Sequence, residues 1–234
     1  MMSGLHEITR IIPEKLVDTP ETILLRKHMV EKQLRTKGIV DQRILSQMEA
    51  VPRHWFCLPG TPSETAYGDY PLPIGWGATI SQPWMVAYML EALKLTGDEV
   101  VLEIGTGSGY NAALLSGLAR SVISLEIVPE LALRSQQLLQ HIGYYNVTVH
   151  QSDGSIGWSS SSPYDAIIVT AGAPDIPESL ARQLRIGGRL VIPAGNRELQ
   201  QLQLAEKTSS GLTLTLLSGC RFVPLLGQEG WDNQ

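Results

Sequence analysis

Three glycines stand in the segment VVLEIGTGSGY, residues 100–110, where a β-branched run gives way to a helical pattern. Glycine allows a tight turn and the close approach of a ligand to the backbone. Gly105, Gly107 and Gly109 follow a G-x-G-x-G spacing, and Tyr110 stands where the dinucleotide fingerprint G-x-G-x-x-G has its third glycine. The loop therefore indicates either a simple strand-to-helix turn or a site for a ligand other than a dinucleotide.

Acidic residues around this loop point to the ligand. Glu103 lies just before the glycines, where a carboxylate would repel a pyrophosphate but attract the ammonium and sulfonium groups of S-adenosylmethionine (SAM). Glu126, near the end of the next strand, is placed to accept hydrogen bonds from both ribose hydroxyls. Asp153, which precedes Gly154, is a candidate acceptor for the adenine amino group, although taken alone it is more typical of a turn. Together these residues predict SAM as cofactor and S-adenosylhomocysteine (SAH) as product.

From residue 99 onward, apolar runs alternate with helical patterns. The runs EVVLEI, SVISLEI and YDAIIVTAG are almost continuously apolar, which is typical of parallel strands covered on both faces. This alternation predicts an α/β fold with a parallel sheet. Residues 198–219 instead indicate two antiparallel edge strands around a turn at 209–211. Parallel strands are predicted at 99–104, 121–127, 146–153, 164–172 and 187–195, and helices at 108–119, 129–143 and 177–184.

The first part of the chain is less regular. Residues 1–20 are expected to be irregular, because prolines interrupt their pattern. Asp41 is a candidate N-cap for a helix, and Gly38 a candidate C-cap. Residues 52–80 are rich in proline, glycine and aromatic residues and show no clear periodicity; irregular stretches of this length are often functional. Helices are predicted at 21–38, 41–52 and 83–95.

The segment VLEIGTGSGY resembles motif I of the class I SAM-dependent methyltransferases. This resemblance implies a doubly wound, mostly parallel, seven-stranded α/β sheet, a Rossmann-like fold, here with an N-terminal helical extension. We expect residues 1–98 to form N-terminal helices and a substrate-side loop of the same domain. Residues 99–234 would form the SAM-binding core with its C-terminal antiparallel hairpin. The implied cofactor-binding residues are Glu103, Gly105, Thr106, Gly107, Ser108, Gly109, Glu126, Ile127, Asp153 and Gly154.

The methyl acceptor is indicated by other segments. Residues 170–177 read TAGAPDIP, without the Asn/Asp-Pro-Pro-Tyr segment that several nitrogen methyltransferases carry there. Over about residues 25–231 the chain resembles the protein-L-isoaspartate O-methyltransferases, with one departure at Ala78, where many bacterial members have glutamine. The matching segments are VPRHWF at 51–56, AYGDYPLPIGWGATISQPWMVA at 66–87, VLEIGTGSGY at 101–110, PYDAIIVTAGAPDIP at 163–177, LRIGGRLVIPAG at 184–195 and FVPL at 222–225.

What this family implies is transfer of the SAM methyl group to the α-carboxylate that is freed when an aspartyl or asparaginyl residue becomes isoaspartyl. The methyl ester then collapses without an enzyme, through a succinimide, toward normal aspartate. The acceptor carboxylate has an unperturbed pKa of about 3.5, so it is ionised at neutral pH and needs no general base. Whether D-aspartyl sites are also accepted is left open.

The acceptor machinery is expected around the TIS segment. We hypothesise that the Ser81 hydroxyl donates to the acceptor carboxylate and that Thr79 helps to place the substrate or the cofactor, both as catalytic residues. The alternative for Ser81 is an N-cap of the helix at 83–95. Ile80 and the main chain around Val223, Pro224 and Leu225 are candidate substrate contacts, with ordinary packing as the alternative. Trp76, Trp84 and Trp231 either roof the cofactor or pack in the core.

The composition and net charge limit the classes of function and location that remain. A net charge of −5 argues against nucleic-acid binding, which usually needs a basic surface. No apolar run reaches the roughly 18 residues of a membrane span, and no signal peptide, disulfide framework or metal-ligand spacing is evident. We therefore expect a cytoplasmic protein, without metal, whose partners are isoaspartyl proteins and peptides, and which is a monomer.

Two other functions stay open at this point. One is a catalytically silent SAM-binding adaptor that recognises isoaspartyl sites. The other is a methyltransferase acting on the oxygen of a small molecule, against which the TIS segment at 79–81 argues.

Overall fold

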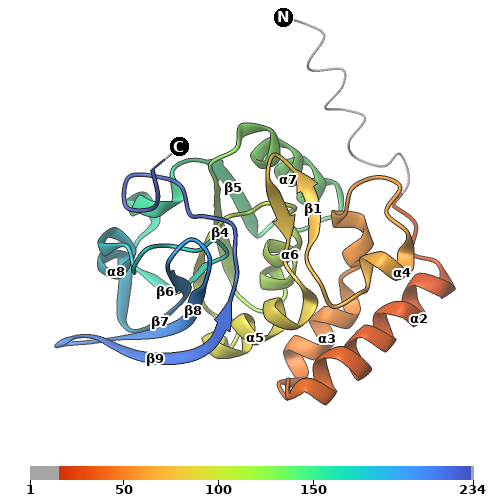
Figure 1. The fold of residues 1–234 in the computed structure, drawn as a ribbon, viewed down its shortest axis with the longest axis horizontal. Helices are drawn as coiled ribbons and strands as arrows, with labels where there is room; N and C mark the ends of the chain where they lie inside the picture. Colours follow the sequence, from red (N-terminus) through yellow and green to blue (C-terminus); the bar gives the residue numbers. More distant parts are fainter. Residues whose placement is uncertain (1–15, 233–234) are drawn as a thin grey trace, which may run out of the picture.

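The computed structural model describes residues 16–232, so the expectation for residues 1–15 lies outside the described part of the chain. Its centre is a seven-stranded sheet of order β5-β4-β3-β6-β7-β8-β9. Strands β3 to β7 are parallel, and β8 is antiparallel to both of its neighbours. The predicted α/β class, parallel core and edge hairpin are thus confirmed (Figure 1). The strands are β3 Val100–Ile104, β4 Ser121–Glu126, β5 Val147–Gln151, β6 Tyr164–Val169, β7 Leu184–Gly195, β8 Gln200–Thr208 and β9 Gly211–Cys220.

Side chains of the parallel strands pack on both faces of the sheet. In β3, Val101 belongs to one buried cluster and Leu102 to the other, because successive residues of a strand point to opposite faces. The larger cluster also holds apolar residues of α5, α6 and α7 together with those of the N-terminal helices, and the smaller one those of α8. These helices are α5 Pro83–Leu93, α6 Tyr110–Ser116, α7 Pro129–His141 and α8 Glu178–Gln183.

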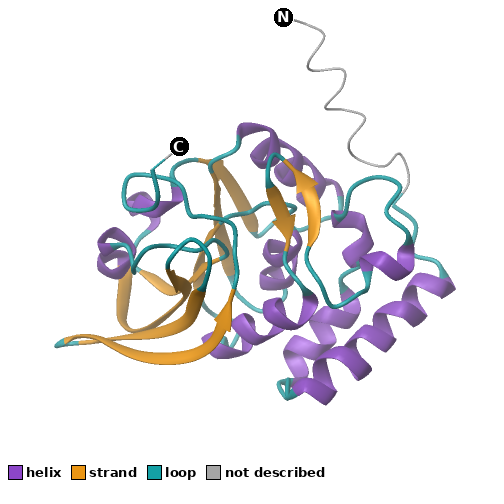
Figure 2. Cartoon of the chain, in the orientation of Figure 1, coloured by secondary structure: helices purple, strands orange, loops and turns teal. Residues whose placement is uncertain are grey.

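The N-terminal helices lie together on one side of the molecule, as Figure 2 shows. The predicted helix at 21–38 is divided into α2 Pro20–His28, a π-helical turn Met29–Leu34 and a short 3₁₀ turn Arg35–Lys37. It ends at Gly38 with φ of 95°, as predicted for a C-cap. Asp41 caps α3 Gln42–Ala50 by accepting the backbone N–H of Arg43 at 2.8 Å, which was also predicted.

Residues 52–80 differ from the sequence-based expectation because they contain regular structure. They form a 3₁₀ turn Arg53–Phe56, α4 Ser63–Ala66, and a hairpin of β1 Leu72–Gly75 with β2 Ala78–Ile80. Elements of three or four residues are too short to give a periodic pattern. The hairpin turns at Trp76 and Gly77, whose φ angles of 51° and 72° are both positive, as in the two-residue turns that suit hairpins.

Candidate functional site

Three adjoining cavities open at the carboxyl ends of the parallel strands. The first, here called the glycine-loop cavity, has a volume of about 280 Å³. The outer cavity, of about 530 Å³, and the inner cavity, of about 40 Å³, both share lining residues with it. Thr79 of β2 and Thr170, which follows β6, line all three. A ligand site at this edge of the sheet is what the parallel topology predicts.

Gly105 and Gly107 form the floor of the glycine-loop cavity. Gly105 has φ of 92°, and a Cβ atom there would lie 2.5 Å from Thr170 Oγ1. The backbone N–H groups of Gly105 and Thr106 both donate to the carbonyl of Leu125 on β4, at 2.8 and 3.1 Å. The loop is therefore held against β4, with its backbone exposed to the cavity.

Gly109 serves a different purpose from the other two glycines. It is the N-cap of α6 with φ of 87°, and a Cβ atom there would meet Ser135 and Leu139 of α7 at 3.3 to 3.5 Å. It lines none of the three cavities. A glycine is therefore required at position 109 because α6 and α7 pack closely there. The sequence alone did not distinguish this packing role from ligand binding.

Glu126, the last residue of β4, lines the glycine-loop cavity with both carboxylate oxygens held in place. Oε2 accepts the N–H of Gly107 at 2.8 Å, and Oε1 accepts the N–H of Val128 at 2.9 Å. Burial raises the pKa of this carboxyl group, and the two backbone hydrogen bonds act in the opposite direction. Because each carboxylate oxygen has two lone pairs, one acceptor position on each oxygen remains for a ligand.

Glu103 lies beneath the loop instead of beside the ligand space. Its side chain is completely buried, and it lines none of the three cavities. Its carboxylate accepts hydrogen bonds from Asn111 Nδ2 at 2.8 Å and from the Ser124 hydroxyl. Burial raises the pKa of Glu103 to about 7. Asn111, whose Oδ1 atom is buried without a partner among the described residues, lines the inner cavity and stands between Glu103 and that space.

Asp153 is already engaged within the protein. Its Oδ1 accepts the N–H and the hydroxyl of Ser155 at 2.9 and 2.7 Å, and its Oδ2 accepts the N–H of Gln228 at 2.8 Å. It does not line the glycine-loop cavity, whereas its neighbour Gly154 does. Asp153 therefore anchors the C-terminal segment, and its contact with the adenine amino group stays a prediction.

The other cofactor candidates divide between two cavities. Ile127 lines the glycine-loop cavity. Thr106 and Ser108 line the inner cavity, where both are almost completely buried. The Thr106 hydroxyl lies 2.5 Å from that of Ser124, and Ser108 Oγ accepts the N–H of Tyr110 at 3.2 Å. These hydroxyls shape the loop from within.

Ser81 does not cap the helix that follows it. The N-cap of α5 is Gln82, whose side chain makes no capping hydrogen bond. The N–H of Trp84 is instead accepted by Asp69 Oδ1 at 2.8 Å. Within residues 16–232 the Ser81 hydroxyl has no hydrogen-bond partner, and it lines both the outer and the inner cavity. Ile80 is buried and lines the inner cavity.

The segment around Pro224 closes the glycine-loop cavity and the outer cavity from the opposite side. The carbonyl of Val223 accepts the N–H of Gly172 at 2.8 Å, and the N–H of Leu225 donates to the carbonyl of Gly172 at 2.8 Å. Some of the main-chain groups that were expected to bind the substrate therefore already form hydrogen bonds within the protein. Val223 and Pro224 line both cavities, and Leu225 lines the glycine-loop cavity.

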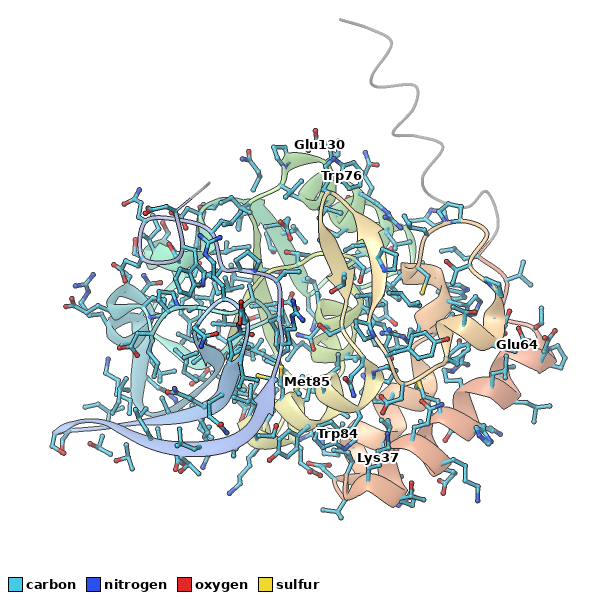
Figure 3. The ribbon with its side chains drawn as sticks, in the orientation of Figure 1. Lys37, Glu64, Trp76, Trp84, Met85 and Glu130 are labelled. Atoms are coloured by element: carbon cyan, nitrogen blue, oxygen red, sulfur yellow. The ribbon has the colours of Figure 1, made fainter. Side chains whose placement is uncertain are left out.

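Several site residues were not identified from the sequence. Thr170 follows β6 as Gly105 follows β3, so the rule that ligands bind beyond the carboxyl ends of parallel strands was a usable signal. No sequence pattern indicated the other three site residues, Asn111, Arg197 and Arg221. Trp76, for which the sequence left two roles open, lines the glycine-loop cavity. It lies at the tip of the β1–β2 hairpin (Figure 3).

Comparison with known proteins shows the family of this chain. Residues 25–230 match the family model described as "Protein-L-isoaspartate(D-aspartate) O-methyltransferase (PCMT)". The chain belongs to this family. A protein-L-isoaspartate O-methyltransferase of Desulfosudis oleivorans is 50% identical over 206 residues, which is 88% of this chain and 93% of the relative. Another, of Geobacter metallireducens, is 50% identical over 90% of this chain and 98% of the relative.

Solved structures of the same family share the fold. A protein-L-isoaspartate O-methyltransferase, 30% identical, superposes with a TM-score of 0.80 over 88% of this chain and 67% of the other. A Plasmodium falciparum protein described as a putative family member, in complex with SAH, is 26% identical, with a TM-score of 0.73 over 86% of this chain and 98% of the other. Family membership thus agrees with the resemblance drawn from the sequence.

Proposed function

We propose that this chain transfers the methyl group of SAM to the α-carboxylate of L-isoaspartyl residues in proteins and peptides, the reaction for which its family is named. One observation carries the assignment of the site. A cavity floored by the glycine loop and a larger cavity with an unpartnered serine hydroxyl adjoin along the shared wall of Thr79 and Thr170. This arrangement suits a methyl donor on one side and an extended peptide on the other.

The glycine-loop cavity fits the nucleoside part of SAM. Glu126 has acceptor positions left on both of its oxygens, which matches the two hydroxyls of a ribose. Gly105 admits a ligand where any side chain would collide with Thr170. When bound, SAM supplies a methyl group attached to its sulfonium sulfur. As the ester C–O bond forms, the C–S bond breaks and its electron pair stays on the sulfur.

Glu103 acts on the cofactor indirectly. Its carboxylate accepts from Asn111 Nδ2 and so orients this amide, which lines the inner cavity. Asn111 Oδ1, buried without a partner among the described residues, is the acceptor that we assign to the ammonium group of SAM. A cation near this cluster favours the ionised form of Glu103 and lowers its pKa from the raised value of about 7. In this role Glu103 is a positioning residue.

Ser81 and Thr79 align the acceptor. The isoaspartyl carboxylate is ionised at neutral pH, so the protein has to orient it and remove water instead of taking a proton. The Ser81 hydroxyl donates to one carboxylate oxygen and leaves the other directed at the methyl group. Alignment of this kind can contribute about 7–11 kcal/mol in favourable cases. Val223 and Pro224 form the wall of the outer cavity that excludes water from the peptide, while Ile80 lines the inner cavity and Leu225 the glycine-loop cavity.

Paired peptides test this function. Tritiated SAM is offered with an isoaspartyl peptide and with the otherwise identical aspartyl peptide. We expect label on the isoaspartyl peptide alone, with SAH formed in equal amount. Binding of the isoaspartyl peptide without transfer would instead support an adaptor. Transfer to a small molecule and to neither peptide would support a different O-methyltransferase.

Partners and location are part of the same proposal. Isoaspartyl proteins and peptides are the substrates, and the protein works in the cytoplasm as a monomer, without nucleic acid. None of the helices in residues 16–232 is both long and apolar enough to cross a membrane. The same residues hold no cluster of three or more histidine, cysteine, aspartate or glutamate side chains suited to a metal.

A further inference from the structure

Two arginines stand on the wall of the outer cavity. Arg197 lies in the loop between β7 and β8, and Arg221 follows β9 directly. Both side chains are exposed. No aspartate or glutamate is among the residues that line this cavity, although the whole chain carries a net charge of −5. The outer cavity is therefore locally basic in an acidic protein.

Neither arginine forms an ion pair within residues 16–232. Three other exposed arginines do: Arg35 pairs with Glu31, Arg182 with Glu178, and Arg185 with Asp165. The positive charges of the outer cavity thus remain available to a ligand.

Arg197 is also held in position. Its guanidinium lies 5.0 Å from the centre of the Trp231 ring, and Nη2 donates to the carbonyl of Asp232 at 3.1 Å. A stacked guanidinium loses less conformational freedom when it binds an anion. The contact with Asp232 occupies one of its five N–H donors, so most remain to form hydrogen bonds with a carboxylate.

We propose that Arg197 and Arg221 bind a second carboxylate of the substrate peptide and thereby favour isoaspartyl sites that lie close to another acidic group. This inference rests on the proposed function. The two arginines line the outer cavity but not the inner one, where Ser81 meets the glycine loop. They are therefore placed for a group beside the reacting carboxylate. A guanidinium on the reacting oxygen itself would stabilise the ground state and oppose transfer.

The second carboxylate has two possible sources in a peptide: the side chain of a neighbouring aspartate or glutamate, or a nearby C-terminus. Both present the same planar anion to a guanidinium. A set of four isoaspartyl peptides separates them. One has neutral neighbours and an amidated end, one has a glutamate beside the isoaspartyl residue, one has a lysine there, and one has neutral neighbours with a free C-terminus two residues away.

The measurement is kcat/KM for each peptide with the full chain, at low and high salt. We expect the wild type to prefer the glutamate or the free-end peptide over the neutral one by about fivefold, the upper range for exposed ion pairs. The lysine peptide should be the poorest substrate, and added salt should weaken the preference. The double variant Arg197→Gln/Arg221→Gln should lose the preference, so that its kcat/KM for the glutamate and free-end peptides becomes equal to its kcat/KM for the neutral peptide.

Arg120→Gln provides the matched control, because Arg120 is also exposed but lies just before β4, at the amino end of that strand, and lines none of the three cavities. It removes the same charge and should keep the preference. An equal kcat/KM for all four peptides in the wild type, or a preference that survives in the double variant, would overturn the inference while leaving the proposed function intact. If the wild type methylates no isoaspartyl peptide at all, the proposed function fails and the inference fails with it.

Discussion

Asp69 Oδ1 accepts the backbone N–H of Trp84 at 2.8 Å, and Asp69, not Ser81, thereby caps the start of α5. The other oxygen of Asp69 pairs with Lys37 Nζ at 2.6 Å, which fixes the carboxylate from the N-terminal helices; Figure 3 shows Lys37 and Trp84 close together. Because the helix terminus is satisfied in this way, the Ser81 hydroxyl is left for the substrate.

Replacing Ser81 with alanine should therefore affect turnover far more than stability. We expect kcat for an isoaspartyl peptide to fall by about 100-fold, the typical loss on removing one aligned hydrogen-bond donor. SAH affinity, measured by calorimetry, should change much less than kcat, because Ser81 does not line the glycine-loop cavity that takes the nucleoside part of SAH. Ser81→Thr keeps a hydroxyl and should recover part of the activity. Unchanged kcat in Ser81→Ala would refute the assignment.

Replacing Asp69 with alanine should affect stability. Loss of an N-terminal cap typically costs about 1 kcal/mol, and here the partner of Lys37 is lost as well. Chemical unfolding should give a lower free energy of unfolding for Asp69→Ala than for the wild type, and no change for Ser81→Ala. The reverse order of the two variants would mean that Ser81 caps the helix after all.

Glu126→Ala should weaken cofactor binding. The substitution removes the acceptors for the ribose hydroxyls and also releases the N–H groups of Gly107 and Val128. Hydrogen bonds to a charged group contribute about 1.5–3 kcal/mol each, so calorimetry with SAH should show at least about tenfold weaker affinity. Glu130→Gln, in the first turn of α7, is the control and should bind SAH normally. Normal SAH affinity in Glu126→Ala would exclude the ribose assignment.

The regular part of the fold was predictable because it depends on local patterns. Strands β3, β4 and β6 are buried on both faces, and their continuous apolar runs record this directly. The positions of Gly105 and Glu126, which both line the glycine-loop cavity, could likewise be predicted, since a glycine turn and an acid at neighbouring strand ends occupy fixed places in the sequence of such folds.

The remaining features depend on partners that are distant in the sequence. Asp69 caps a helix that begins 14 residues later, at Pro83, and Asp153 binds the N–H of Gln228, 75 residues away. No local pattern reveals such a partner, so a helix cap stayed open as the alternative for Ser81, and the sequence did not show that Asp153 anchors the C-terminal segment. Glu103 precedes the glycines in the sequence, but the sequence did not indicate that its side chain is completely buried beneath the loop.

Glu103 should make the protein less stable as the pH rises toward neutrality. Burial raises its pKa from 4.5 to about 7. Between these values the folded protein keeps a proton that the unfolded chain releases, so the free energy of unfolding falls with increasing pH and levels off above about 7. The difference in unfolding free energy between the wild type and Glu103→Gln should follow this course. A difference that does not vary between pH 4.5 and 7 would show that the folded pKa is not raised.

Gly105→Ala should disturb both stability and binding. Its φ of 92° is unfavourable for alanine, and the added Cβ atom would lie 2.5 Å from Thr170 Oγ1. Gly211→Ala is a useful comparison, because φ is 131° there but the Cβ atom meets open space. We expect thermal unfolding at a lower temperature and weak SAH binding for Gly105→Ala, and normal SAH binding for Gly211→Ala. Equal behaviour of the two variants would exclude the close approach at Gly105.

A crystal structure with SAH and an isoaspartyl peptide tests the arrangement of the two ligands most directly. The account predicts the ribose hydroxyls on Glu126, the homocysteine sulfur near Thr79 and Thr170, and one oxygen of the isoaspartyl carboxylate within hydrogen-bond distance of Ser81 Oγ. A peptide carboxylate bound away from Ser81, or SAH bound outside the glycine-loop cavity, would contradict it.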